Sequence, residues 1–226
     1  MREALDKAKL KAIYDRVAPR YDFQHSFLTG GSDQRGRKVV VEKAVRPGDR
    51  VLDCGGGTGS TALLALRRAG DSGTVVVLDM SDGMLSGARA RAKQAGAKDR
   101  VAFCGGDMVE LPFRDASFDV ALSTYSMCPL YDPVKGAMEL FRVVKPGGRI
   151  GIAHSTDPET PLVKRLAEVV EGVVWRLPSI SLGCRSVSVL PILERAGCRV
   201  LFKRQIGIPL WPFLVFVLEK TARQEG

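Results

Sequence analysis

The sequence predicts an α/β fold in which helices flank a doubly wound, mainly parallel β-sheet with an antiparallel last strand. Short apolar runs alternate with longer segments of helical spacing, a pattern typical of parallel strands joined by right-handed crossovers. A glycine-rich loop at 55–59 directly follows an apolar run and opens a helix. The last two apolar segments are joined by a short Gly/Pro connection, which favours an antiparallel pair at the edge of the sheet.

The composition is that of one globular domain, 1–226. Of the 226 residues, 45% are hydrophobic and 26% are charged, and a chain this apolar buries enough surface to offset its ordering entropy. The most apolar run, 206–218, is too short to cross a bilayer and contains Pro209 and Pro212. Residues 1–20 are charged and lack the apolar core of a secretory leader. We therefore expect a cytoplasmic protein.

The chain carries an excess of positive charge. Its 34 Lys and Arg residues exceed 25 Asp and Glu residues, a formal net charge of +9, which favours an anionic partner such as a lipid surface. The basic residues are spread along the chain without a nucleic-acid-binding motif, so a solvated surface is favoured and nucleic-acid binding is not expected. Five cysteines without a C-x-x-C pair and two histidines indicate reduced thiols and no metal site.

In the N-terminal half, a charged helix is expected over 2–16 and an irregular stretch over 18–31. The further helices are expected over 37–45, 58–69 and 81–95, and the strands over 50–54, 74–78 and 101–104. Ser81 is the expected N-cap of the last of these helices, and Gly96 is its stop signal.

In the C-terminal half, the alternation first continues and then changes. A strand is expected over 118–123 and a helix over 132–144, followed by a type II turn at 145–148 and a strand over 149–153. The tail is expected to hold helices over 162–174 and 187–196 and strands over 198–203 and 211–219.

Carboxylates at strand ends make the glycine loop a candidate nucleotide site. Glycines allow a tight turn and let a ligand lie against main-chain N–H groups at a positive helix end. Asp53 closes the first strand, Asp79 closes the second, and Asp107 follows the third. The three can face one crevice, where Asp79 would bind ribose hydroxyl groups. Each could instead cap a helix, and the loop alone could be a plain turn.

The position of Asp53 distinguishes two kinds of nucleotide. Residues 57–62 satisfy the G-x-G-x-x-A variant of nicotinamide-binding loops. An acid directly before the turn would, however, repel a pyrophosphate and attract a cation such as an α-amino group. The loop therefore suits a ligand with an ammonium group and no phosphate, which describes S-adenosylmethionine. An NAD(P)-dependent oxidoreductase is the second hypothesis.

Five motifs together resemble the class I S-adenosylmethionine-dependent methyltransferases, which have a Rossmann-like fold. They are VLDCGGGTG at 51–59, LDMS at 78–81, GDM at 106–108, FDVALS at 118–123 and RVVKPGGR at 142–149. The resemblance implies that the methionine end is held by Asp53 and the loop, with Gly55, Gly57, Thr58 and Gly59. It also implies that Asp79 binds the ribose, that Met80, Asp107 and Met108 contact the adenine, and that Ser123 lines the cofactor. Core filling is the alternative for the two methionines.

A segment before these motifs resembles the ubiquinone/menaquinone biosynthesis C-methyltransferase family. It reads YDRVAPRYD at 14–22 and LTGGSDQR at 28–35, and the resemblance implies a helical cover over the cofactor. Tyr14 and Tyr21 are expected to close over S-adenosylmethionine, although packing of an amphipathic helix would explain them equally. The domain would then consist of a cover over 1–45, a cofactor-binding core over 46–156, and a C-terminal part over 157–226 with substrate-side helices and closing strands.

Two departures from that family leave the acceptor open. An Arg-Asn pair usual after the fourth strand is replaced by Tyr125-Ser126, and Leu-Glu-Phe-Ser after the fifth is replaced by AHST at 153–156. The expected reaction is methyl transfer to a small hydrophobic acceptor such as a demethylated quinol. Phosphatidylethanolamine, a thiol or another small molecule are alternatives. Peripheral membrane contact and the oligomeric state are left open.

Carbon methylation of a quinol needs a proton acceptor, which points to His154 or His25. A lone histidine is, however, more often structural than catalytic. Because methyl transfer is an in-line displacement at a sulfonium, positioning and desolvation can supply most of the catalysis. A third hypothesis is a cofactor-binding, non-catalytic partner subunit.

Overall fold

A computed structural model describes residues 4–158, 160–174 and 182–221, and the strands within them form one seven-stranded sheet. They are β1 (Arg50–Cys54), β2 (Thr74–Asp79), β3 (Val101–Gly105), β4 (Phe118–Thr124), β5 (Val144–Ser155), β6 (Cys198–Ile208) and β7 (Trp211–Lys220). Their order is β3-β2-β1-β4-β5-β7-β6, with β7 antiparallel to both neighbours and the other pairs parallel. The expected mainly parallel sheet with an antiparallel last strand is confirmed.

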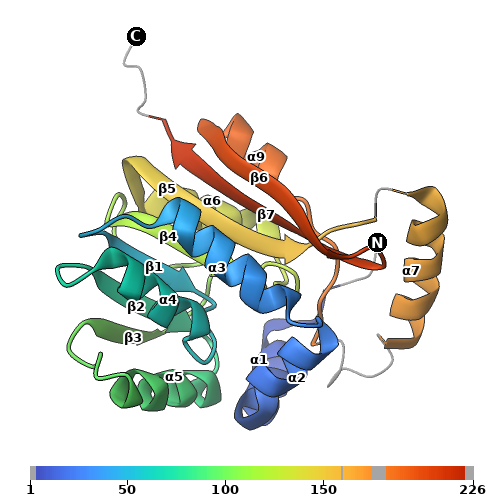
Figure 1. Ribbon diagram of the computed structural model, residues 1–226, viewed down its shortest axis with the longest axis horizontal. Coiled ribbons are helices and arrows are strands. Elements are labelled where there is room, and N and C mark those ends of the chain that lie inside the picture. The colour runs from blue at the N-terminus through green and yellow to red at the C-terminus, as the bar shows by residue number, and fades with distance from the viewer. Residues whose placement is uncertain (1–3, 159, 175–181, 222–226) are drawn as a thin grey trace.

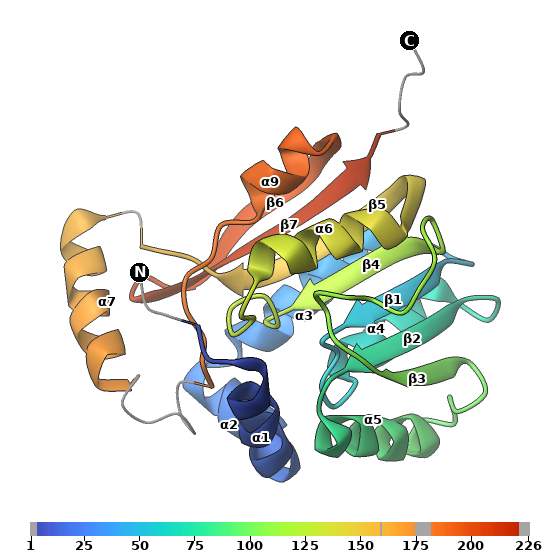
Figure 2. The same cartoon turned by 180° about the vertical axis from the view of Figure 1, so that it is seen from behind.

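Helices cover both faces of this sheet. One apolar cluster packs α3 (Ser32–Ala44), α4 (Ser60–Ala69) and α5 (Asp82–Gln94) onto the face turned to the viewer in Figure 1. A second cluster packs α6 (Pro133–Val143) and α9 (Leu190–Arg195) onto the face seen in Figure 2. Neighbouring residues of β1 alternate between the clusters, Val51 in the first and Leu52 in the second, because successive strand side chains point to opposite faces.

Side-chain caps determine where several helices begin. Ser81 accepts a hydrogen bond at 3.1 Å from the backbone N–H three residues on, so the predicted cap of α5 is confirmed. Asp132 caps α6 and Asp6 caps α1 (Lys7–Val17) in the same way. The helix expected over 2–16 therefore starts at Lys7, and residues 2–3 lie outside the described part of the chain.

The stretch over 18–31, expected to be irregular, is largely helical. A 3₁₀ turn, η1 (Ala18–Arg20), joins α1 to α2 (Tyr21–Leu28). Tyr21 and His25 are buried and lie one helical turn apart, a spacing typical of the inward face of a helix. The polar residues around them make this periodicity difficult to recognise in the sequence. Figure 1 places α1 and α2, the N-terminal cover, beyond the ends of the parallel strands, and α7 (Pro161–Val174) lies at the same end.

Other helix and strand boundaries differ from the expected ones where turns or strand pairing have more influence than the local sequence pattern. α3 begins five residues before its expected start, directly after Gly31, whose φ is 74°. The helix expected over 187–196 is limited to α9, with a proline in its first turn. β5 continues beyond 153 and β6 beyond 203 because both pair along β7, and the early start of β5 at Val144 comes from its pairing with Phe118 of β4. Within the described ranges, no helix has the length and apolarity that a bilayer span requires.

Candidate functional site

The glycine-rich loop between β1 and α4 presents bare backbone because larger residues would not fit. Gly55, Gly57 and Gly59 have φ angles of 64°, 56° and 82°, a region that residues with a Cβ atom avoid. A Cβ atom on Gly55 would lie 2.4 Å from the Cβ of Ser126. The main chain is therefore held close to the end of β4, directly before the N-terminus of α4, where N–H groups favour anionic ligand groups.

A cavity of about 660 Å³, counted with its open mouth, lies between this loop and the N-terminal cover. Eight residues named from the sequence line it, and they are Tyr14, Tyr21, Gly55, Gly57, Thr58, Asp79, Met80 and Met108. Among the described residues that line it, Arg37 and Asp79 are the two that carry a formal charge. A mostly apolar cavity with a few placed polar groups is typical of a site for an organic ligand.

Asp79 ends β2 with both carboxylate oxygens held by the backbone. Oδ2 accepts a hydrogen bond from the N–H of Gly57 and Oδ1 from the N–H of Ser81, both at 2.9 Å. Burial raises the pKa of Asp79 above its usual range, against the effect of these hydrogen bonds. Each oxygen retains a lone pair, so Asp79 can accept hydrogen bonds from ligand hydroxyl groups.

Asp53 lies fully buried under the loop. Its exposed fraction is 0% and it does not line the cavity, and neither carboxylate oxygen has a hydrogen-bond partner of normal geometry among the described residues, although the nearby backbone N–H of Ala62 favours its ionised form. A Cβ atom on Gly56 would approach Oδ2 to 2.9 Å. Burial raises the pKa of Asp53 to about 7, although the charge of Arg37 acts in the opposite direction. Because a buried carboxyl without partners is costly, this site fits a ligand that brings an ammonium group close to the loop.

The N-terminal cover is fastened to the glycine loop through Asp22 of α2. Both carboxylate oxygens of Asp22 accept the hydrogen bond of the Thr58 hydroxyl at 2.9 Å, and Oδ1 also accepts one from Ser60 at 3.2 Å. Arg91 of α5 forms an ion pair with the same carboxylate. Thr58 lines the cavity as expected, but its hydroxyl group is engaged by the cover.

Further polar contacts join the cover to α5 and to the segments that follow β2 and β3. Asp15 accepts hydrogen bonds from the Ser81 hydroxyl at 2.6 Å and from the N–H of Gly83 at 3.2 Å. Lys7 forms a 2.7 Å ion pair with Asp107, which also accepts a hydrogen bond from Tyr131. Burial would raise the pKa of Asp107, but these two donors outweigh it and lower that pKa. Asp107 is not on the cavity wall, so its role at the adenine stays a prediction.

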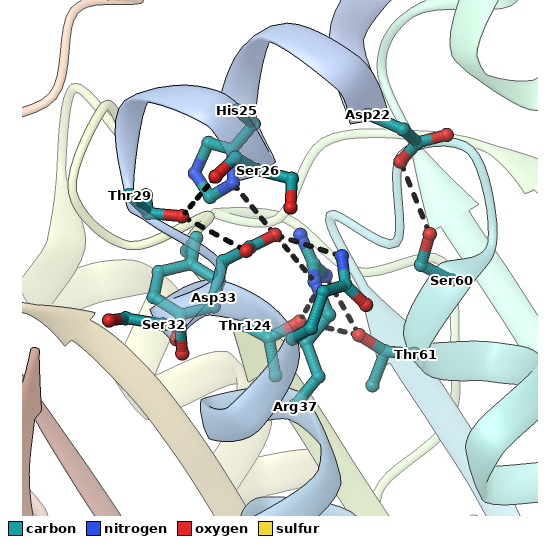
Figure 3. Close-up of polar contacts among 12 residues, drawn as sticks. Asp22, His25, Ser26, Thr29, Ser32, Asp33, Arg37, Ser60, Thr61 and Thr124 are labelled. Carbon is teal, nitrogen blue, oxygen red and sulfur yellow. Dashed lines mark hydrogen bonds and ion pairs between the residues drawn. The ribbon is translucent and has the colours of Figure 1, made fainter.

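A buried polar network lies behind the cavity, between α2 and α3 (Figure 3). The Asp33 carboxylate accepts hydrogen bonds from the Thr29 hydroxyl and the Gln34 amide, both at 2.9 Å, and contacts Nδ1 of His25 at 3.1 Å. Burial alone would raise the pKa of Asp33, but the bond from His25 and the charge of Arg37 lower it to about 2. The carboxylate thus stays ionised inside the protein.

Arg37 connects this network to the cavity. Its Nη1 donates hydrogen bonds to the hydroxyl groups of Thr61 and Thr124 at 2.9 and 2.8 Å (Figure 3). The guanidinium also lies over the ring of Tyr125, 5.2 Å from its centroid. Tyr125 has a φ of 63°, which is unusual for a residue with a side chain, and this turn at the end of β4 places its ring on the cavity wall.

Neither histidine lies on the cavity wall. The ring of His25 packs against Tyr21 and Tyr125, each with centroids 5.3 Å apart, and both tyrosines do line the cavity. His154 of β5 is fully buried, and its Nδ1 is 2.8 Å from the carbonyl oxygen of Ser155. Burial lowers the pKa of His154, and no described group pairs with its Nε2. Direct proton transfer to His154 therefore has no geometric support.

Ser123 and Gly59 are likewise behind the wall rather than on it. Ser123 is fully buried and its hydroxyl is 2.7 Å from that of Ser126, which lines the cavity. The sequence motifs did not reveal Arg37, Thr124 or the contact of Asp22. Each of these contacts joins residues that are far apart along the chain. The local sequence offered one signal, the acidic residue Asp22 in a segment expected to be irregular.

The fold is shared with solved methyltransferases and with other proteins. The [4+2]-cyclase SpnF matches with a TM-score of 0.76 and 20% identity, covering 98% of each chain. The YcgJ protein from Bacillus subtilis matches at 0.68 and 20%, covering 84% of this chain and 99% of that one. A geranyl diphosphate C-methyltransferase from Streptomyces coelicolor A3(2), in complex with S-adenosyl-L-homocysteine, matches at 0.68 and 14%, covering 83% and 79%. The fold is that of the Rossmann-like methyltransferases.

Sequence comparison assigns the family. The chain belongs to the ubiE/COQ5 methyltransferase family, whose model matches residues 2–175. It is 41% identical over 169 residues to a demethylmenaquinone methyltransferase of Clavibacter sepedonicus, covering 73% of this chain and 66% of that protein. It is 34% identical over 164 residues to a ubiquinone/menaquinone biosynthesis C-methyltransferase UbiE of Teredinibacter turnerae, covering 72% and 66%. The matches thus span about two thirds of the length of these relatives. The predicted family resemblance is confirmed.

Proposed function

We propose that this protein binds S-adenosylmethionine in the cavity and transfers its methyl group to a carbon atom of a hydrophobic, quinol-type acceptor. The observation that carries the proposal is the cavity itself, which joins a bare glycine loop and Asp79 on one wall to apolar and aromatic side chains on the other. The acceptor class comes from the relatives named for demethylmenaquinone and for ubiquinone/menaquinone biosynthesis.

The residues at the loop fit the proposed cofactor. Asp79 would hold the ribose hydroxyl groups, and the loop N–H groups would hold the carboxylate of the methionine end. Asp53 would supply the negative charge for the ammonium group, since its oxygens have no partner among the described residues. When bound, S-adenosylmethionine supplies a methyl group on a positively charged sulfur. Around it, the protein's task is to position the acceptor and exclude water.

Neither histidine lines the cavity, and of the two we favour His25 for deprotonation of the acceptor because it packs against residues of the cavity wall. His25 packs against two tyrosines of the cavity wall, and Asp33 holds its Nδ1, an arrangement that orients an imidazole as a base. Asp33 is then a positioning residue. A His25→Gln variant should lower kcat while leaving cofactor affinity unchanged.

Relatives named as C-methyltransferases favour a carbon acceptor over a phospholipid or a thiol, and membership of a methyltransferase family disfavours a nicotinamide oxidoreductase. The direct test is incubation of the protein with methyl-labelled S-adenosylmethionine and either a chemically reduced demethylmenaquinone or phosphatidylethanolamine. Label in the quinol product supports the proposal. Label in the phospholipid would show that the acceptor is a phospholipid and not a quinol. Calorimetric binding of S-adenosylmethionine without transfer to any acceptor would instead indicate a non-catalytic subunit.

A further inference from the structure

Large apolar side chains are exposed at the end of the molecule that holds the cavity. On α2, Phe23 and Phe27 are 78% and 77% exposed. On α7, Leu162 and Leu166 are 77% and 57% exposed. Each pair is spaced by four residues and so shares one face of its helix. Figure 1 shows both helices beyond the ends of the parallel strands.

The helix α2 has two different faces. Tyr21, on the inner face, lines the cavity and His25 packs against it. On the outer face, the rings of Phe23 and Phe27 stack with centroids 6.2 Å apart and an interplanar angle of 16°. Single exposed apolar residues are common, but a stacked aromatic pair left in water indicates an interaction surface.

Exposed arginines lie near both apolar pairs, although α7 itself also contains Glu168 and Glu171. Arg16 and Arg20, which precede Phe23, are exposed, and no acidic residue of the described ranges pairs with them. The acidic residue of α2, Asp22, is turned to Thr58 and Arg91 instead. Arg165 is exposed between the two leucines of α7. Aromatic and aliphatic side chains flanked by unpaired arginines complement an anionic lipid surface.

We propose that α2 and α7 dock this protein on the surface of an anionic lipid bilayer. Phe23 and Phe27 enter the boundary between headgroups and acyl chains, and the arginines contact the lipid phosphates. The surface goes beyond the proposed function, which concerns only the cavity. Because one helix contacts the bilayer on its outer face and the cavity on its inner face, an apolar acceptor would reach the site without crossing water.

The test is flotation of the purified full chain with vesicles of phosphatidylcholine and phosphatidylglycerol, or of phosphatidylcholine alone. The wild-type protein should float with the anionic vesicles, less with the neutral ones, and less at high salt. The double variant Phe23→Ser/Phe27→Ser should lose about tenfold or more in vesicle affinity, since each ring loses its burial in lipid. A variant Arg16→Gln/Arg20→Gln should lose mainly the preference for anionic vesicles.

The matched control is Leu201→Ser, which changes a side chain that is 41% exposed on the edge strand β6, and it should float like the wild type. Equal flotation of wild type and F23S/F27S would overturn the proposal, as would a wild-type protein that stays with the soluble fraction. If the wild type is a dimer in size-exclusion chromatography and F23S/F27S is a monomer, the surface is instead a contact between two copies of the chain. Flotation needs no cofactor and calorimetry of S-adenosylmethionine needs no vesicles, so failure of this proposal is distinguishable from failure of the proposed function.

Discussion

The two walls of the cavity are built in opposite ways. The sheet wall uses backbone from consecutive residues, Gly55 to Thr58, and a carboxylate at the end of the neighbouring strand. The cover wall is held by side chains whose partners lie far along the chain, as Asp22 with Thr58 and Asp15 with Ser81. The first wall therefore depends on close steric fit, and the second on several polar contacts of moderate strength.

This difference leads to unequal sensitivity to substitution. In the sheet wall, a Cβ atom added at Gly55 or Gly56 has no room, because it would lie within 3 Å of Ser126 or of Asp53. In the cover wall, a lost contact leaves the other contacts in place, and each half-exposed polar pair is worth little alone. Substitutions in the loop should therefore have the largest effects and those in the cover the smallest.

The largest effect is expected for Gly55→Ala. The added Cβ atom would lie 2.4 Å from the Cβ of Ser126 and would stand on a backbone with a φ of 64°. Overpacking and a left-handed alanine together should lower the free energy of unfolding by about 3 kcal/mol and abolish measurable cofactor binding. Chemical denaturation and calorimetry measure the two effects.

Gly96→Ala is the control for the backbone contribution. Gly96 has a φ of 65°, yet a Cβ atom there would meet nothing within 4 Å. Its substitution should cost about 1 kcal/mol and leave cofactor binding unchanged. If both variants were equally destabilised, the contact with Ser126 would not explain the glycine.

A smaller effect is expected for Asp79→Ala, which removes a carboxylate from the sheet wall but adds no atom. Loss of the proposed ribose contacts should weaken S-adenosylmethionine binding by about 2–3 kcal/mol, or about 30- to 150-fold. Asp79→Asn keeps the size of the side chain and should retain part of that affinity. Wild-type affinity in Asp79→Ala, measured by calorimetry, would remove this residue from the site.

The same contrast explains how much the sequence could predict. The strands, the loop and Asp79 follow from local patterns, since a buried strand, glycines and an acid at fixed spacing need no knowledge of distant residues. The helix α2 was missed because its inward-facing residues Tyr21 and His25 lie within a polar segment. Arg37 was missed because its partner Thr124 is 87 residues away, a pairing that only the fold creates.

Substitution of Asp53 should have an effect between those of the sheet wall and the cover wall. This effect depends on pH. A free aspartate titrates near 3.8, whereas burial raises the pKa of Asp53 to about 7. Its contribution to stability is thus complete below pH 3.8 and is lost as the pH rises towards 7. The loss can reach about 1.4 kcal/mol per pH unit. Asp53→Asn should remove this pH dependence. It is measured by comparing the free energies of unfolding of the wild type and the variant across this pH range.

An ammonium group next to Asp53 would favour the ionised carboxylate. Cofactor affinity in the wild type should therefore rise by about tenfold between pH 6 and pH 8, and binding should release protons, which calorimetry in buffers of different ionisation enthalpy detects. The affinity of Asp53→Asn should not change with pH in this way. Parallel pH profiles for both proteins would show that the buried carboxyl does not meet the charged end of the cofactor.

The smallest effect is expected for Asp22→Asn in the cover. The carboxylate is about one third exposed, with a fraction of 32%, and Asn preserves its shape while removing the charge that Arg91 contacts. Affinity for S-adenosylmethionine should fall by about fivefold, or about 1 kcal/mol, through faster dissociation, because the other contacts of the cover remain. Asp82→Asn is the control, since Asp82 pairs with Lys11 but is 86% exposed, and its dissociation rate should match the wild type. If Asp22→Asn weakened binding as strongly as Asp79→Ala, the cover would be as rigid a part of the site as the glycine loop, and the contrast between the walls would be wrong.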